Sequence, residues 1–232
     1  MSKNLPSKIH IPEIDANFLL IPAGAFYVGR SRDEDSPRRL AAITKPFYMQ
    51  ETLVTQRQYQ AITGTNPSNF TYNLENPVEQ VNWPESVDFA QKLSQQTGLV
   101  FRLPTEMEWE YAARGGDGDK YLYAGSNKID EVGWYNVNSR NQTRPVKQKK
   151  PNGYGLYDMT GNVSEWCLDG YYSKYPNEEL IDYQGIAGSA SYLVNRGGSW
   201  FSRAQVASRD YSNPAGSSSY LGFRLVLEGP KE

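Results

Sequence analysis

The chain has 232 residues, 38% of them hydrophobic, and a formal net charge of −2, which suits one large domain or two small ones. No basic patch dominates, so nucleic acid is not an expected partner, and no apolar run is long enough to span a membrane. The single cysteine, Cys167, excludes an internal disulfide, and the N-terminus has no apolar signal region. Both features favour a cytoplasmic location.

The N-terminal part of the chain predicts short strands. Residues 1–16 form a tail or a leading strand, and the only histidine, His10, is interpreted as a solvated residue of that tail. Residues 17–29 predict two short strands, because Pro22-Ala-Gly24 interrupts the apolar run. The acidic run Asp33, Glu34 and Asp35 has no glycine-based loop pattern and is interpreted as a solvated turn.

The middle of the chain predicts helices. A strand at 45–55 leads into a helix that Thr55 caps and Gly64 ends. A second helix covers 81–98, with Pro84 in its first turn and Gly98 after its last.

A strand at 99–103 precedes a third, short helix. Thr105 and Glu108 have the spacing of a capping box, and Gly115-Gly116 end the helix. Glu106 and Glu110 share one face of it, and all three glutamates are interpreted as capping and first-turn residues rather than catalytic acids.

After residue 116 no further helix is predicted. Residues 221–227 place Leu221, Phe223, Leu225 and Leu227 on one face, which predicts a half-buried strand. The chain therefore predicts a single α+β domain at 17–228, with two main helices, short twisted antiparallel strands and many irregular loops.

Four stretches together carry a family resemblance: "RLPTEMEWEYAARGG" (102–116), "PNGYGLYDMTGNVSEW" (151–166), "NRGGSW" (195–200) and "LGFRLV" (221–226). In this order and spacing they resemble the formylglycine-generating enzyme, or sulfatase-modifying factor, family across residues 17–227. The resemblance implies a C-type lectin-like fold.

The chemistry of that family does not carry over to these residues. Its oxidases bind copper through two cysteines between "GGS" and "GFR", but this segment has none, and Val206 stands about where the second would be. Other relatives hold iron with several histidines, and this chain has one. Neither copper nor iron is expected, no catalytic residue is assigned, and Cys167 is interpreted as a small buried residue.

The turn at "MTGNVSEW" is a candidate calcium site. By the resemblance, Thr160, Gly161 and Val163 would supply backbone oxygens and Glu165 a carboxylate, which are ligands that Ca²⁺ prefers. Alternatively, Glu165 accepts hydrogen bonds from backbone amides of a tight turn. A second family site at Asn136 is not expected, because the following loop is short here.

Residues 196–226 have a narrower resemblance, to the variable region of proteins diversified by retroelements. Adenine mutagenesis of Asn codons there yields codons that cannot encode Lys, Glu, Gln, Met or Trp. Between Phe201 and Leu227 the chain has none of these except Gln205. The residues reachable in this way are the predicted ligand-binding set: Phe201, Ser202, Arg203, Val206, Asp210, Tyr211, Ser212, Ser218, Ser219 and Tyr220.

Composition agrees with a binding surface, since tyrosine with serine, asparagine and glycine is typical of paratopes. Arg196 and Arg224 are expected to hold loops by hydrogen bonds to carbonyls. The sequence therefore predicts a domain that binds a ligand, most simply another protein. The alternatives are a metal-dependent oxidase or oxygenase of the family, and an accessory domain in which 196–226 is an ordinary loop.

Overall fold

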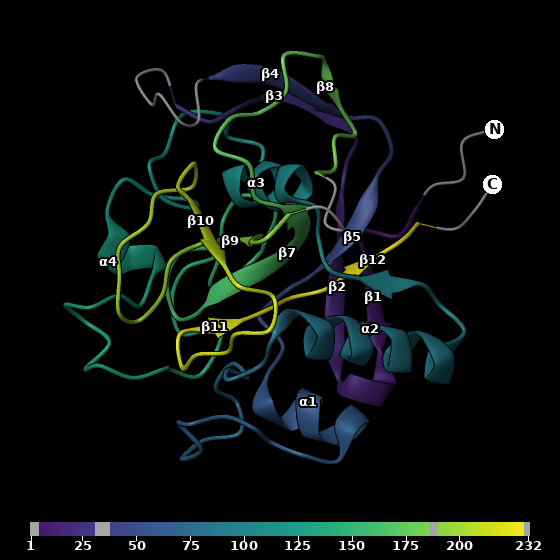
Figure 1. Ribbon diagram of the computed structural model, residues 1–232, viewed down its shortest axis with the longest axis vertical. Coiled ribbons are helices and arrows are strands. Elements are labelled where there is room, and N and C mark those ends of the chain that lie inside the picture. The colour runs from purple at the N-terminus through teal and green to yellow at the C-terminus, as the bar shows by residue number, and fades with distance from the viewer. Residues whose placement is uncertain (1–4, 31–37, 186–189, 230–232) are drawn as a thin grey trace.

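The computed structural model describes residues 5–30, 38–185 and 190–229. Within these ranges the chain forms sheets of five, four and three strands, with helices against them and long irregular connections between them (Figure 1). The predicted α+β class is confirmed. The acidic run Asp33–Asp35 lies outside the described residues.

The five-stranded sheet is antiparallel throughout, in the order β1-β2-β5-β12-β6. Its strands are β1 (Lys8–Ile11), β2 (Ala16–Ile21), β5 (Phe47–Gln50), β12 (Val226–Leu227) and β6 (Phe101–Arg102). A 3-10 helix, η1 (Pro12–Ile14), joins β1 to β2. His10 is an exposed residue of β1, beside Asn17 and Asp15.

The predicted helices are confirmed as α1 (Gln56–Thr63), α2 (Trp83–Thr97) and α3 (Glu106–Arg114). Each begins with a complete capping box, formed at α3 by Thr105 and Glu108. Each ends at a glycine in the left-handed region, for example Gly98 at φ +73°, which a residue with a Cβ adopts less readily. The short loops then turn the chain back onto the sheets.

Helix α3 lies between the two smaller sheets, whereas α1 and α2 pack at the other end of the molecule (Figure 1). The three-stranded sheet has the order β3-β4-β8, and the four-stranded sheet the order β10-β9-β7-β11. Their strands are β3 (Gly24–Val28), β4 (Arg39–Ile43), β8 (Leu180–Ile181), β10 (Arg209–Ser212), β9 (Leu193–Arg196), β7 (Ser164–Gly170) and β11 (Leu221–Gly222). Two of these pairings, β4 with β8 and β7 with β11, are parallel.

The structure corrects three details of the expected secondary structure. A fourth helix of one turn, α4 (Ile129–Val132), lies in the region where none was predicted. Glu165 lies in β7 rather than in the preceding turn. Residues 221–227 form β11 and β12 in two different sheets, and all seven are buried, so the expected half-buried strand is wrong.

Two apolar clusters form the core, one around Trp109 and the other around Trp166. The first lies under β3 and β4 and the second under α1 and α2. Among the described residues, none of the helices has both the length and the apolar character needed to cross a membrane.

Candidate functional site

Most of the predicted ligand-binding residues lie at the surface of the segment that runs from β9 through β10 to β11 (Figure 1). Ser212, Ser218 and Ser219 are half-buried. The exposed members of the set are Phe201, Ser202, Arg203, Asp210, Tyr211 and Tyr220.

Val206 is a correction to this set. Its side chain is only 3% exposed and belongs to the apolar cluster around Trp109, and its N–H donates to the Leu122 carbonyl at 2.9 Å. A side chain buried in this cluster cannot contact a ligand while the domain is folded. We therefore remove Val206 from the candidate surface.

One exposed aromatic pair is formed by Phe201 and Tyr220, which are 63% and 43% exposed. Their rings stack with centroids 6.2 Å apart, and Trp200 packs behind Phe201 at 5.6 Å. The Trp200 Nε1 donates to the Ser219 carbonyl at 2.8 Å, while its ring meets Phe70 edge-on at 5.5 Å. The pair therefore rests on a fixed aromatic base that is held by a hydrogen bond.

A second aromatic group surrounds Tyr211, which is 46% exposed. Its ring lies 4.3 Å from Tyr171 and 5.1 Å from Tyr192, measured between centroids. Sequence reasoning missed Tyr171 and Tyr192, since both lie outside residues 196–226. The pairing of β10 with β9 places Tyr211 beside Tyr192. The Tyr171 N–H donates to the Tyr192 carbonyl at 2.9 Å, which brings Tyr171 to the same group.

The main chain of the segment is held by groups outside it. The N–H groups of Gln80, Trp83 and Ser164 donate to carbonyls of the segment, those of Ser218, Pro214 and Tyr220, at 2.8–3.1 Å. Trp200 in turn donates its N–H to the Asn162 carbonyl at 2.8 Å. These bonds use backbone atoms of the segment, so they do not depend on which side chains the segment carries.

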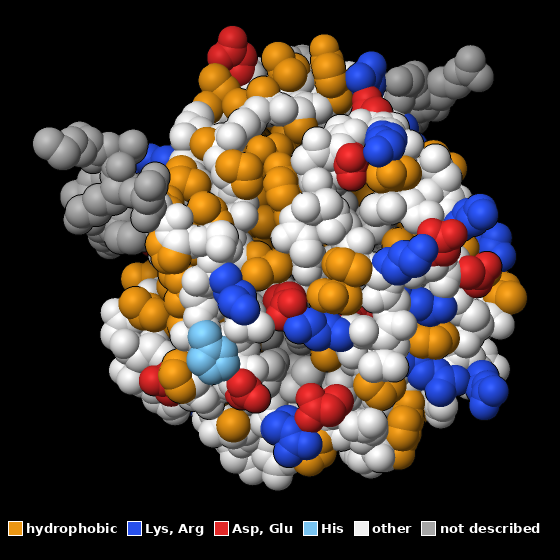
Figure 2. All heavy atoms as spheres, turned by 180° about the vertical axis from the view of Figure 1, so that it is seen from behind, with side chains coloured by type: hydrophobic (Ala, Val, Ile, Leu, Met, Phe, Trp, Pro, Cys, Tyr) orange, Lys and Arg blue, Asp and Glu red, His pale blue; other side chains and the backbone are white. Residues whose placement is uncertain are grey.

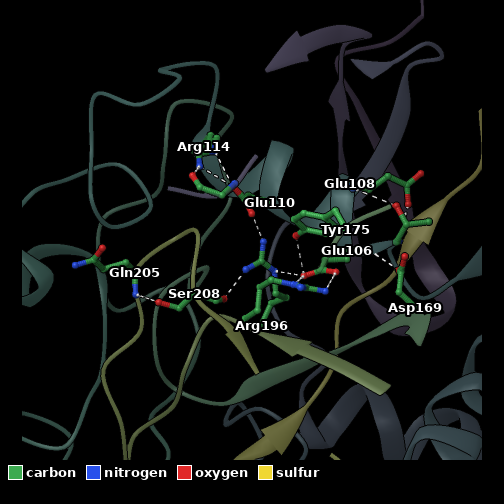
Figure 3. Close-up of polar contacts among 12 residues, drawn as sticks. Glu106, Glu108, Glu110, Arg114, Asp169, Tyr175, Arg196, Gln205 and Ser208 are labelled. Atoms are coloured by element: carbon green, nitrogen blue, oxygen red, sulfur yellow. Dashed lines mark hydrogen bonds and ion pairs between the residues drawn. The ribbon is translucent and has the colours of Figure 1, made fainter. Parts of the chain in front are cut away.

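A buried network of charges lies beneath β10 (Figure 3). Arg196 is placed between Glu106 and Glu110 of α3, and it also donates to the Ser208 carbonyl. Arg209 donates to both Glu106 oxygens, at 2.6 and 3.0 Å.

The network corrects the interpretation of two of the α3 glutamates. Glu108 caps α3 as predicted, whereas Glu106 and Glu110 are buried partners of arginines. Arg114 completes the network at 2.5 Å from Glu110, so α3 is an anionic anchor for the segment.

Asp169 joins this network to the start of α3. Its two carboxylate oxygens accept from the N–H groups of Glu106 and Gly185, each at 2.6 Å. Burial, followed by the negative charge of Glu106, raises the pKa of Asp169 to about 7. Burial likewise raises the pKa of the Cys167 thiol, which is fully buried in β7 as interpreted from the sequence.

Arg196 and Arg224 hold loops through carbonyls, as predicted. Arg224 also forms a fully buried ion pair with Glu165, in which both carboxylate oxygens accept hydrogen bonds from the guanidinium.

The Arg224–Glu165 ion pair affects the predicted calcium site. Thr160, Gly161, Val163 and Glu165 are all buried, and the only carboxylate among them is already neutralised by Arg224. Ca²⁺ takes carboxylate oxygens together with neutral carbonyl oxygens. The one carboxylate of this set is engaged by Arg224, so the four residues do not fit the ion as they are arranged. Asn136, of the second family site, is exposed.

The three sheets, the irregular connections and the "GNVSEW" and "GFR" segments together define a domain of the sulfatase-modifying type. A family model described as "Sulfatase-modifying factor enzyme 1-like domain" matches residues 12–229. The chain belongs to this family.

Relatives in the family have different descriptions. The chain is 30% identical to "Chaperone protein LppX" of Paenibacillus barcinonensis, over 85% of this chain and 83% of that protein. It is 35% identical to the formylglycine-generating enzyme of Streptomyces coelicolor over 68% of this chain, but it spans only 55% of that enzyme.

Solved structures agree on the fold. "Treponema denticola variable protein 1" superposes with a TM-score of 0.89 at 31% identity, covering 96% of this chain and 98% of that one. PvdO from Pseudomonas aeruginosa superposes at 0.86 with 23% identity, covering 97% of this chain and 100% of that one, and this likeness shows the fold alone.

Proposed function

We propose that this protein is a ligand-binding domain whose exposed side chains in residues 201–220 contact a protein ligand, and that residues 196–226 are its diversified segment. The observation that carries the proposal is the combination of exposed aromatic side chains with a main chain held from outside the segment. Such an arrangement lets side chains change while the loop keeps its path. The similarity to a variable protein over 96% of the chain supports it.

The chemical character of the surface fits this role. Tyrosine and phenylalanine supply rigid contact area with few rotatable bonds, and serine supplies adaptable hydrogen bonds. Phe201, Tyr211 and Tyr220 are the exposed anchors, and the serines lie among them. Tyrosines are enriched at protein-binding hot spots, where contacts of little energetic weight surround them.

We further propose that the domain has no oxidase activity. The copper chemistry of the family needs two thiolates, and this sequence has one cysteine. Cys167 lies buried in β7, where burial raises its pKa and keeps it in the thiol form. Val206, at the position of the second family cysteine, is an apolar core residue. The residues present do not fit a copper pair.

A second candidate is a fixed accessory surface without diversification. The similarity to a protein described as a chaperone, over 83% of its length, favours it. So does the similarity to the Chlamydia pneumoniae serine/threonine-protein kinase pkn1, at 35% identity, of which this chain covers 24%. In this alternative the same face would bind one unchanging partner.

Sequencing of the genomic DNA around the coding region tests the two candidates. We expect a second, near-identical copy of the codons for 196–226 that differs at adenines, close to a reverse-transcriptase reading frame. Absence of both from a complete genome sequence would remove diversification and leave the accessory surface. Stoichiometric copper or iron in purified protein would contradict the absence of oxidase chemistry.

A further inference from the structure

A basic segment lies beside the candidate surface. Residues 133–157 contain five basic residues and no acidic one, although the whole chain has a net charge of −2. The other residues therefore carry a formal charge of −7, the difference between −2 and +5. The net charge of the whole chain therefore does not reveal the local excess of positive charge in this segment. The basic residues are Arg140, Arg144, Lys147, Lys149 and Lys150.

The basic segment is held in a defined conformation. Arg144 donates its N–H to Asn162 Oδ1 at 3.0 Å, and the Arg144 carbonyl accepts from Asn162 Nδ2 at 2.9 Å. Arg144 and Lys149 both lie over the ring of Trp134, 5.5 and 4.0 Å from its centroid. Two cations gathered on one indole ring are positioned before any partner arrives, which lowers the entropy lost on binding.

The basic segment is continuous with the candidate surface. Ser139 Oγ donates to the Trp200 carbonyl at 2.9 Å, directly behind the exposed Phe201. Arg203, an exposed member of the ligand-binding set, lies 4.8 Å from the centroid of the Tyr135 ring. Seen from behind, Lys and Arg side chains gather along the right-hand margin of the molecule, the side on which α4 lies (Figure 2).

Neighbouring acids neutralise this charge only in part. Lys147 pairs with Glu51 at 2.6 Å, and Lys150 lies 3.4 Å from Glu131, with the side chains of Lys150 and Glu131 71% and 37% exposed. An exposed ion pair such as Lys150–Glu131 is weak and exchanges partners readily. An approaching carboxylate can therefore compete for the same ammonium groups.

We propose that the partner of this domain is a protein with an acidic face, which contacts the basic segment while its apolar side chains meet Phe201 and Tyr220. This inference rests on the proposed function and specifies the chemistry of the ligand. Opposite charges across an interface accelerate association and align the partners. A constant basic flank would supply this steering to every variant of the changing surface.

Titration with a synthetic poly-L-glutamate peptide of about twenty residues tests the proposal, since such a peptide supplies closely spaced carboxylates. Its binding to the full chain is measured by fluorescence anisotropy at low and at physiological salt. The variant is R140Q/K150Q, and the matched control is K8Q/K92Q, on β1 and α2 at the opposite side of the molecule (Figure 1). Each double variant removes two exposed cations, and each includes one lysine near an acidic partner, Glu131 or Asp88.

We expect R140Q/K150Q to weaken binding about fivefold at low salt, the size expected for two exposed ion pairs, and the control to change it less than about twofold. Absence of binding, or equal losses in both variants, would overturn the proposal. Tighter binding of a thymidine oligonucleotide of equal charge would also overturn it, by indicating a nucleic-acid partner. The genomic test of the proposed function does not involve charge, so these failures would leave that function standing.

Discussion

Arg224 and Glu165 form an ion pair in which both side chains are completely buried. The Arg224 Nε lies 2.6 Å from Glu165 Oε2, and Nη2 lies 3.0 Å from Oε1. Arg224 also donates to the carbonyls of Tyr157 and Gln50, at 2.9 and 3.3 Å. The pair therefore joins β7 and the end of β5 to the link between β11 and β12, and every arm of the guanidinium has an acceptor.

Loss of Arg224 alone should be strongly destabilising. R224M leaves the Glu165 carboxylate buried without a cation, and we expect the free energy of unfolding to fall by about 3–5 kcal/mol in urea denaturation. The control is R57M, because the pair of Arg57 with Glu75 is half exposed on both sides, and its loss should be about 1 kcal/mol or less. Equal losses of unfolding free energy in the two variants would show that the buried ion pair stabilises the fold no more than the exposed one.

Calcium should leave the protein unchanged. Because Arg224 occupies the Glu165 carboxylate, we expect millimolar calcium to produce no binding heat and no rise in the melting temperature of chelator-treated protein. A rise that chelation reverses would show instead that the turn at Thr160–Val163 binds the ion, with Arg224 displaced from Glu165.

Substitution of the exposed tyrosines should weaken ligand binding, whereas substitution of Val206 should lower the stability of the fold. Y211A and Y220A should each lower the free energy of unfolding by about 1 kcal/mol or less and weaken binding of a ligand isolated by pull-down. V206A should instead lower it by roughly 1–3 kcal/mol, since it leaves a cavity in the core. Circular dichroism melts check all three, and a large loss of stability in Y220A would make that residue part of the core.

Asp169 should make stability depend on pH. The folded pKa of about 7 lies above the ordinary value of 3.8, so the folded state binds the proton more tightly than the unfolded state does. The stability that this proton contributes is present in full below pH 3.8 and is lost as the pH rises through 7. From pH 5 to 8 we expect the wild type to lose on the order of 2 kcal/mol relative to D169N.

Urea denaturation at several pH values measures this difference. D169N loses one acceptor and is expected to be less stable than the wild type at low pH, with the gap closing as the pH rises. A gap that stays constant across this range would contradict a raised pKa at Asp169.

Local signals made part of the fold predictable. Thr55, Thr105 and Glu108 act within three residues of their partners, so the caps of α1 and α3 and the helices that they begin could be predicted from the sequence. The two strands within residues 221–227 could not be predicted, because the alternation of apolar side chains does not indicate which strand pairs with each end of the segment. Here β7 takes Leu221 and β5 takes Val226, and the link between them is buried on both sides.

The candidate site was predictable to a similar extent. The exposed aromatics lie within one segment, and the resemblance of that segment to a variable region, with which its composition agrees, pointed to them. Tyr192 and Tyr171 come from other segments and depend on strand register. Glu106 and Glu110 were assigned to helix capping because their arginine partners, Arg209 and Arg196, lie 103 and 86 residues away.

The inward side chain of Val206 limits the repertoire that such a surface could offer. If its codon varied with the others, charged or bulky replacements would meet the packed cluster around Trp109 rather than a ligand. Protein variants with such replacements would not fold, whatever their affinity for a ligand. If the segment is diversified, fewer of its variants would fold than its codons can encode. Variants that keep a small apolar residue at position 206 would be the ones that retain the fold.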